Sequence, residues 1–100
     1  MKPEILIEVR FRTESEGGRL TPVQGNFYAC PLFIDGIGFD CRIYLNNLSL
    51  QLGETYTVPV KFLNIESVQS RLVVGTKIVL WEGKDVADGS IVKILPFMEF

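Results

Sequence analysis

Three stretches of the chain alternate apolar and polar residues, and this period of two constrains the fold more than any other feature. The stretches are ILIEVRFR at residues 5–12, FDCRIYL at 39–45 and TYTVPVKF at 55–62. Successive side chains of a β-strand point to opposite faces, so such alternation predicts strands with one face in a hydrophobic core and the other in water. The expected inward residues are Ile5, Ile7, Val9, Phe11, Phe39, Cys41, Ile43, Leu45, Tyr56, Val58, Val60 and Phe62.

Three further strands are predicted from shorter apolar runs. TKIVLW at 76–81 and GSIVKIL at 89–95 flank the expected turn EGKDVA at 82–87, and NFYACPLF at 26–33 supplies the sixth strand. Because Pro59 cannot donate to a neighbouring strand, we expect an edge or a bulge there. No segment of ten or more residues carries a helical stripe bounded by caps. Six short strands predict an all-β domain that closes into a small barrel, since closure removes exposed sheet edges.

The composition is that of one globular domain. The 100 residues are 47% hydrophobic, enough for a core without metals or disulfides. We assign residues 1–100 to a single unit, with its core at about 4–95 and a short tail, PFMEF, at 96–100. Ten Lys and Arg residues against twelve Asp and Glu residues give a net charge of −2, without a basic cluster. No membrane-length apolar run or signal-peptide pattern occurs, so we expect a cytoplasmic protein.

The reactive residue types argue against an enzyme. The chain has no histidine, the commonest general base, and no carboxylates, lysines or tyrosines stand in a catalytic spacing. Its two cysteines, Cys30 and Cys41, cannot complete a zinc site without histidine partners. We expect both to be reduced structural thiols, with a redox role as the less favoured alternative. No catalytic residue, cofactor or metal site is predicted.

The stretch ESEGGRLTPVQG at residues 14–25 is longer than a hairpin turn requires. Together with LGETYTVPVKFL and GTKIVLWEGKDVADGSIVKIL later in the chain, it resembles the third, C-terminal domain of translation elongation factor Tu. In that family the first strand ends in a Glu-Gly-Gly-Arg-His-Thr-Pro motif. Leu20 stands at the histidine position here, and the matching residues are Glu16, Gly17, Gly18, Arg19, Thr21 and Pro22.

The resemblance implies a six-stranded antiparallel β-barrel, present as a stand-alone domain. The family's GTPase domain has a phosphate-binding loop that ends in Gly-Lys-Ser/Thr, and no such segment occurs in this sequence. We therefore expect neither nucleotide binding nor hydrolysis. In the family, the glycine loop and nearby turns contact the T-stem backbone of transfer RNA. The positions that correspond to these contacts are Arg19, Thr21, Asn64 and Gly83.

A purely structural role is the favoured interpretation of the glycine loop. Gly17 and Gly18 then supply positive φ angles, and Arg19 is solvated or paired with a carboxylate. Glu14 and Glu16 flank the loop and would repel phosphate. The loop is therefore expected to be a barrel connection first and an RNA contact only as the alternative.

The strand at 76–81 provides a second candidate surface. One register leaves Lys77, Val79 and Trp81 on the outer face, the orientation that the resemblance favours. An outward tryptophan is a candidate anchor for a protein partner. A register shifted by one residue would instead bury Trp81 in the core.

Two functions remain open. The favoured one is a non-catalytic binding module that contacts a protein partner, and the alternative is a translation-related module that contacts a tRNA stem. An RNA reader should group its basic residues on one face, whereas here they alternate with acids. The tail aromatics Phe97 and Phe100 either cap the barrel or extend the surface around Trp81.

Overall fold

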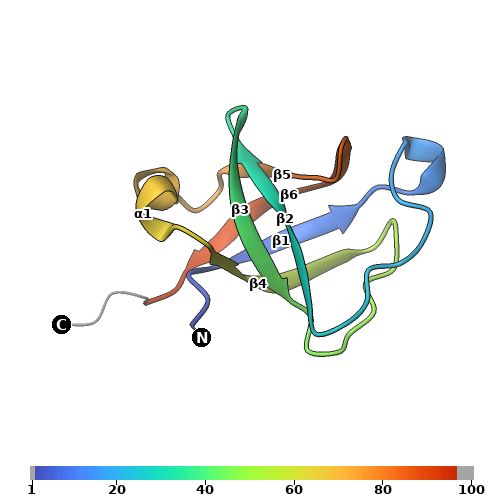
Figure 1. Cartoon of the computed structure of the whole chain (residues 1–100), viewed down its shortest axis with the longest axis horizontal. Coiled ribbons are helices and arrows are strands. Elements are labelled where there is room, and N and C mark those ends of the chain that lie inside the picture. Colours follow the sequence, from blue (N-terminus) through green and yellow to red (C-terminus); the bar gives the residue numbers. More distant parts are fainter. Residues whose placement is uncertain (1, 97–100) are drawn as a thin grey trace.

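The computed structural model describes residues 2–96 and consists mainly of β-strands (Figure 1). The connections contain a one-turn helix, α1 (Ile65–Val68), and two 3₁₀ turns, η1 (Glu14–Glu16) and η2 (Gln69–Arg71). Phe97 and Phe100 lie outside the described residues. The six strands are β1 (Ile5–Phe11), β2 (Phe27–Ile34), β3 (Ile37–Tyr44), β4 (Thr55–Phe62), β5 (Lys77–Trp81) and β6 (Asp85–Ile94).

The strands close into one barrel in the order β1-β4-β3-β2-β5-β6, and each is antiparallel to both neighbours. The prediction of an all-β, closed, six-stranded antiparallel barrel is therefore confirmed. β2 and β3 form a hairpin around the two-residue turn Asp35–Gly36, whose φ angles are 50° and 80°. Two positive φ angles in sequence are typical of a type I′ turn, which matches the twist of the paired strands.

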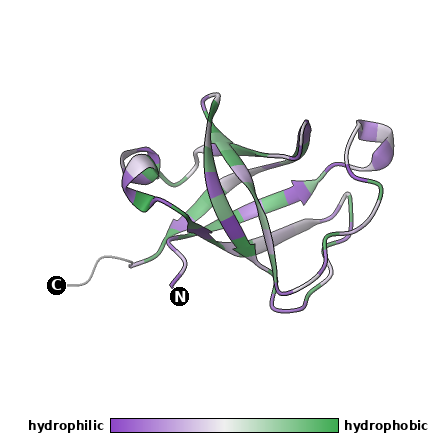
Figure 2. Ribbon diagram, viewed as in Figure 1, coloured by the Kyte–Doolittle hydropathy of each residue, from purple (hydrophilic) through white to green (hydrophobic). Residues whose placement is uncertain are grey.

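The alternation in the sequence places the core as expected. Ile5, Ile7, Val9 and Phe11 of β1 are fully buried. Figure 2 shows hydrophobic and hydrophilic residues alternating along β1 and β3. Of the other predicted inward residues, Phe39 and Tyr56 are half-buried and pack against the core from its margin, and the fully buried ones are Cys41, Ile43, Leu45, Val58, Val60 and Phe62.

The closing hairpin departs from the prediction. The expected turn at 82–87 is too long, because β6 already begins at Asp85, which pairs with Trp81. Val86 and Ala87 are buried in the barrel rather than exposed in a turn. Gly83 has a φ of 74°, and the Glu82 N–H donates to the Lys84 carbonyl oxygen, so the chain reverses within residues 82–84. A register shift between Leu80 and Trp81 accompanies this tight reversal.

Pro59 confirms the expected edge. The ladder between β3 and β4 runs along β4 from Val60 to Phe62, and Pro59 lies directly beyond it. On its other side β4 continues to pair with β1, with Pro59 opposite Leu6. At Pro59, β4 is therefore paired with β1 but not with β3, and a residue without an N–H is tolerated at such a position.

Candidate functional site

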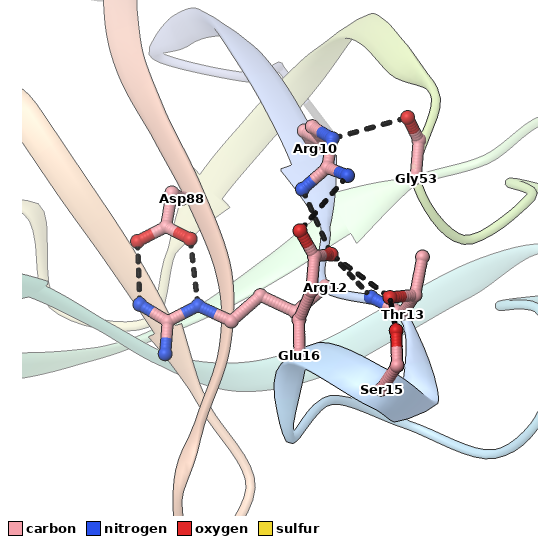
Figure 3. A network of polar contacts seen from close by, with 7 residues as sticks. All are labelled: Arg10, Arg12, Thr13, Ser15, Glu16, Gly53 and Asp88. Atoms are coloured by element: carbon pink, nitrogen blue, oxygen red, sulfur yellow. Dashed lines mark hydrogen bonds and ion pairs between the residues drawn. The ribbon is translucent and has the colours of Figure 1, made fainter.

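The connection after β1 is fixed to the outside of the barrel by a network of polar contacts (Figure 3). The two terminal nitrogens of Arg10 contact the two carboxylate oxygens of Glu16, at 3.1 and 3.2 Å. The Nε of Arg10 donates to the carbonyl oxygen of Gly53 at 3.1 Å. Glu16 also accepts a hydrogen bond from the backbone N–H of Thr13 at 2.8 Å. These contacts hold η1 against β1 and join it to the turn that precedes β4.

A second ion pair joins β1 to β6. Arg12 donates from Nε and a terminal nitrogen to the two carboxylate oxygens of Asp88, both at 2.7 Å (Figure 3). This two-point contact uses the planar fork of the guanidinium group. The side-chain hydrogen bond from Arg12 lowers the pKa of Asp88 below its ordinary value. The backbone hydrogen bond from Thr13, followed by the contact with Arg10, lowers the pKa of Glu16 to about 2.

We expect the stabilising contribution of Glu16 to be lost in acid. Because the pKa of Glu16 is about 2 in the folded protein against an ordinary 4.5, the contribution is complete above the ordinary value and disappears as the pH falls through the folded one. Glu16→Gln removes the charge but keeps the size. In urea unfolding, the gap between this variant and the parent should be widest near about pH 6 and should close towards about pH 2. A constant gap across that range would mean that the charge contributes nothing.

The two glycines of the connection serve different purposes. Gly17 ends η1 with a φ of 83°, which confirms the expected left-handed conformation. The same expectation is wrong for Gly18, which is not among the residues with positive φ. Gly18 is instead buried against β1, where a Cβ would lie 2.0 Å from the carbonyl oxygen of Arg12. The second glycine therefore allows a close approach of two backbone segments.

Arg19 is paired with a carboxylate, one of the two states expected for it. Its guanidinium forms an ion pair with Glu82 of the closing hairpin and donates to the carbonyl oxygen of Thr21 at 3.2 Å. The phenol of Tyr28 on β2 donates to the same Glu82 carboxylate. The guanidinium carbon also lies 5.5 Å from the centre of the Tyr28 ring, within range of a cation–π interaction. This cluster ties the connection after β1 to β2 and to the end of β5.

The four positions that match tRNA contacts are divided between two ends of the barrel. Arg19 and Gly83 are neighbours, because Glu82 beside Gly83 binds Arg19, and Thr21 follows in the same connection. Asn64 directly precedes α1, which lies at the opposite end of the barrel from η1 (Figure 1). Since Glu82 neutralises the guanidinium of Arg19, Arg19 itself offers little free positive charge to a phosphate.

The outer side of β5 and β2 carries a cluster of apolar side chains. Ile78 and Leu80 are buried, which places Lys77, Val79 and Trp81 on the outer face as predicted. Trp81 is 40% exposed, and its ring lies against that of Phe33, with the ring centroids 6.3 Å apart. We call Phe33, Val79 and Trp81 the aromatic face. The register with Trp81 in the core is excluded.

Phe33 is the member of this face that the sequence interpretation missed. It enters because β2 pairs with β5 through Leu32 opposite Leu80 and Phe33 opposite Val79. On the other side Phe33 faces Gly38 of β3, where a Cβ would lie 2.8 Å from the phenylalanine ring. The glycine therefore leaves room for the outer end of the phenylalanine ring over β3. The alternation of buried Leu32 and Ile34 around Phe33 was the signal that could have identified it.

A hollow of about 470 Å³ borders the aromatic face on the β6 side. Gly89 is part of its lining, and a Cβ at this position would lie 2.0 Å from the carbonyl oxygen of Glu8, so the glycine allows β6 to approach β1 closely. Lys77 and Asp88 contribute charges of opposite sign to its lining. The aromatic face is thus bordered by an indented surface of mixed charge.

A further polar centre is the buried carboxylate of Glu4, which pairs with Lys61 and accepts the backbone N–H of Phe62 at 2.7 Å. Cys30 and Cys41 are buried free thiols. Among residues 2–96, no three His, Cys, Asp or Glu residues gather in a way that could hold a metal ion. None of the helices in the described part of the chain has the length and apolar character needed to cross a membrane.

Comparison of the chain with protein-family models and with curated proteins finds no match. The assignment of function therefore depends on the surfaces of the barrel.

Proposed function

We propose that the chain is a non-catalytic module, with a barrel like the third domain of elongation factor Tu, that binds a protein partner through the aromatic face and the adjacent Lys77. The observation that carries this proposal is the exposure of Trp81. Tryptophan is strongly buried on average, and here it lies on the outside of a barrel whose interior is filled by other side chains. Tryptophan is also among the residues most enriched at the energetic centres of protein interfaces.

The surroundings of Trp81 support a role as a binding anchor. Contact with Phe33 limits the motion of the indole, so less conformational entropy is lost when a partner covers it. Both residues stand on paired strands of a closed sheet rather than on a mobile loop. The mixed charges of Lys77 and Asp88 beside the face suit the polar rim of a protein interface.

The likeness to the elongation factor domain is supported by strand number, closure and the position of the glycine connection. That connection follows β1, as in the family motif, and reaches the closing hairpin through Arg19 and Glu82. The likeness supports a binding role rather than nucleotide hydrolysis, since the nucleotide-binding loop of the family does not occur in this sequence.

The proposal is tested by affinity capture from a cell extract with three immobilised proteins. These are the parent, Trp81→Ala and Leu63→Ala, the last changing an exposed leucine outside the aromatic face. We expect the parent and Leu63→Ala to retain the same protein and Trp81→Ala to lose it. Equal retention by all three would place the binding surface elsewhere. Nucleic acid in the eluates is measured in parallel.

Transfer RNA is the competing partner, and we expect no Arg19-dependent binding to it. The guanidinium of Arg19 is already engaged by Glu82, so Arg19→Ala removes little free positive charge. Fluorescence anisotropy with labelled tRNA should show no saturable binding at about 0.15 M salt for either protein. Binding that falls steeply with salt and is lost in a folded Arg19→Ala variant would favour the RNA-binding function instead.

A further inference from the structure

We propose that Cys30 and Cys41 form a dithiol site, which a low-molecular-weight disulfide oxidises to a disulfide between β2 and β3. Cys30 lies directly opposite Cys41 in the antiparallel register of the two strands. Both side chains are buried, and both are free thiols. The sequence separation of the cysteines gives no sign of this pairing, which results from the hairpin register.

The register of the hairpin is fixed at both ends. At one end Ile34 pairs with Ile37 across the two-residue turn. At the other end the N–H of Leu45 donates to the carbonyl oxygen of Asn26 at 2.9 Å. A slip of the strands would break this pairing and turn the cysteines away from each other. The two cysteines are therefore held opposite each other while the barrel is folded.

The backbone spacing at this position suits a disulfide. Every second residue pair of an antiparallel ladder is hydrogen-bonded. Asn26 and Leu45 form such a hydrogen-bonded pair, and Cys30 with Cys41 lies four residues further along the same ladder, so it is a hydrogen-bonded pair as well. The Cα atoms of such a pair are about 5.5 Å apart. Disulfides commonly join residues with Cα atoms roughly 4.4 to 6.8 Å apart. A disulfide also needs Cβ atoms roughly 3.5 to 4.5 Å apart, and the side chains of a hydrogen-bonded pair stand at the wide end of the cross-strand range of about 4.5 to 5.5 Å, so the bond requires β2 and β3 to draw together locally.

The two thiols already interact. A hydrogen bond with Cys30 is the main cause, followed by burial, that raises the pKa of the Cys41 thiol. Cys41 therefore keeps its proton at neutral pH. Since Cys30 is 7% exposed and Cys41 only 2%, Cys30 is the thiol that an oxidant reaches first.

The surface above the cysteines offers a route for the oxidant. A hollow of about 280 Å³ is lined by both cysteines together with the small side chain of Ala29. Within the described residues, the pairing of β2 with β5 covers Leu32 and Phe33 alone. The part of β2 that contains Cys30 is thus paired on one side, by β3, and can move outward without breaking a ladder to β5.

The reaction consists of two thiol–disulfide exchanges. The Cys30 thiolate attacks one sulfur of the oxidant RSSR, forming a mixed disulfide and releasing RS⁻. The mixed disulfide removes the hydrogen bond between the two thiols that raised the pKa of Cys41. Cys41 then gives its proton to the released RS⁻, and its thiolate attacks the Cys30 sulfur, which forms the Cys30–Cys41 bond and releases a second RS⁻. The two protons lost by the cysteines convert both RS⁻ ions to RSH. The oxidant is thereby reduced to two thiols, and the protein loses two hydrogen atoms.

Oxidised glutathione is the probe that tests this site. Folded parent protein should give a monomer whose mass falls by about 2 Da, and non-reducing peptide mapping should join the Cys30 and Cys41 peptides. Dithiothreitol should restore the original mass. Cys41→Ser should stop at a stable glutathione adduct on Cys30. Cys30→Ser should leave Cys41 unmodified over the same time, because Cys41 is only 2% exposed and glutathione does not reach it directly.

Three results would contradict the proposed dithiol site. In the first, the thiols of the parent stay free in the presence of oxidised glutathione. In the second, both cysteines of the parent keep a bound glutathione, and in the third, the disulfide joins two chains. Circular dichroism checks that each serine variant keeps its strand content. The arm with the parent protein uses no substitution, so it decides the proposal even if a variant fails to fold. Because no partner enters the experiment, its outcome is separate from that of the proposed function.

Discussion

Replacement of Gly18 by alanine is expected to destabilise the protein by at least about 3 kcal/mol, the upper end of the usual cost of overpacking. The added Cβ would lie 2.0 Å from the carbonyl oxygen of Arg12, a backbone atom of the residue that directly follows β1. Gly18 cannot move away freely, because its N–H donates to the carbonyl oxygen of Thr13 at 2.8 Å. The loss is measured as the free energy of unfolding in urea.

Gly17→Ala is the matched control. No atom lies within 4 Å of a Cβ at this position, so the substitution tests backbone conformation alone. With a φ of 83°, an alanine here should cost about 1 to 2 kcal/mol. Equal losses in the two variants would show that the connection relaxes away from β1 and that the close approach at Gly18 is not a constraint.

The strands could be predicted because their signal is local. Ile5, Ile7 and Val9 point inward for a reason contained within five residues of sequence, the alternation of a pleated strand. The start of β6 had no such signal. Glu82, Gly83 and Lys84 are typical turn residues, and whether the turn continues into Asp85 depends on the pairing of Asp85 with Trp81. That pairing is a property of two strands together.

The surroundings of the candidate site depended on long-range pairing and could not be predicted in full. The outward position of Trp81 followed from the alternation within β5, but its contact with Phe33 requires the register of β2 against β5. The ion pair between Arg19 and Glu82 likewise joins residues from opposite ends of the chain. Residue types indicated that Arg19 would find a carboxylate, and only the closed barrel specifies which one.

Four of the six residues that match the elongation factor motif have a structural role in this protein. Glu16 binds Arg10, Gly17 takes a left-handed conformation, Gly18 allows the approach to β1, and Arg19 binds Glu82. These roles explain the four positions without a nucleic acid. The aromatic face makes no comparable internal contribution beyond the contact between Trp81 and Phe33. The aromatic face is therefore a better candidate for binding than the glycine connection.

Trp81→Ala is expected to weaken binding to the protein partner by at least about 2 kcal/mol, or roughly thirtyfold in Kd, the threshold for an interface hot spot. Stability should change far less. The indole is 40% exposed and its ring contacts Phe33, so its removal should cost about 1 kcal/mol for the aromatic pair in addition to the apolar area that it covers, and less in total than the truncation of a fully buried tryptophan. Calorimetric titration with the captured partner and urea unfolding of the same preparations provide the two measurements.

The ratio of these two losses separates an anchor from a core residue. A tryptophan that mainly stabilises the barrel would lose about 3 to 5 kcal/mol of folding free energy on truncation, as buried aromatics do. In that case the weaker binding would follow from unfolding. Val79→Ala lies on the same face and should reduce binding by a smaller amount, whereas the exposed Leu63→Ala should reduce neither quantity. Unchanged affinity in a stable Trp81→Ala variant would contradict the proposal, because Trp81 is the largest side chain of the aromatic face and should contribute most to binding there.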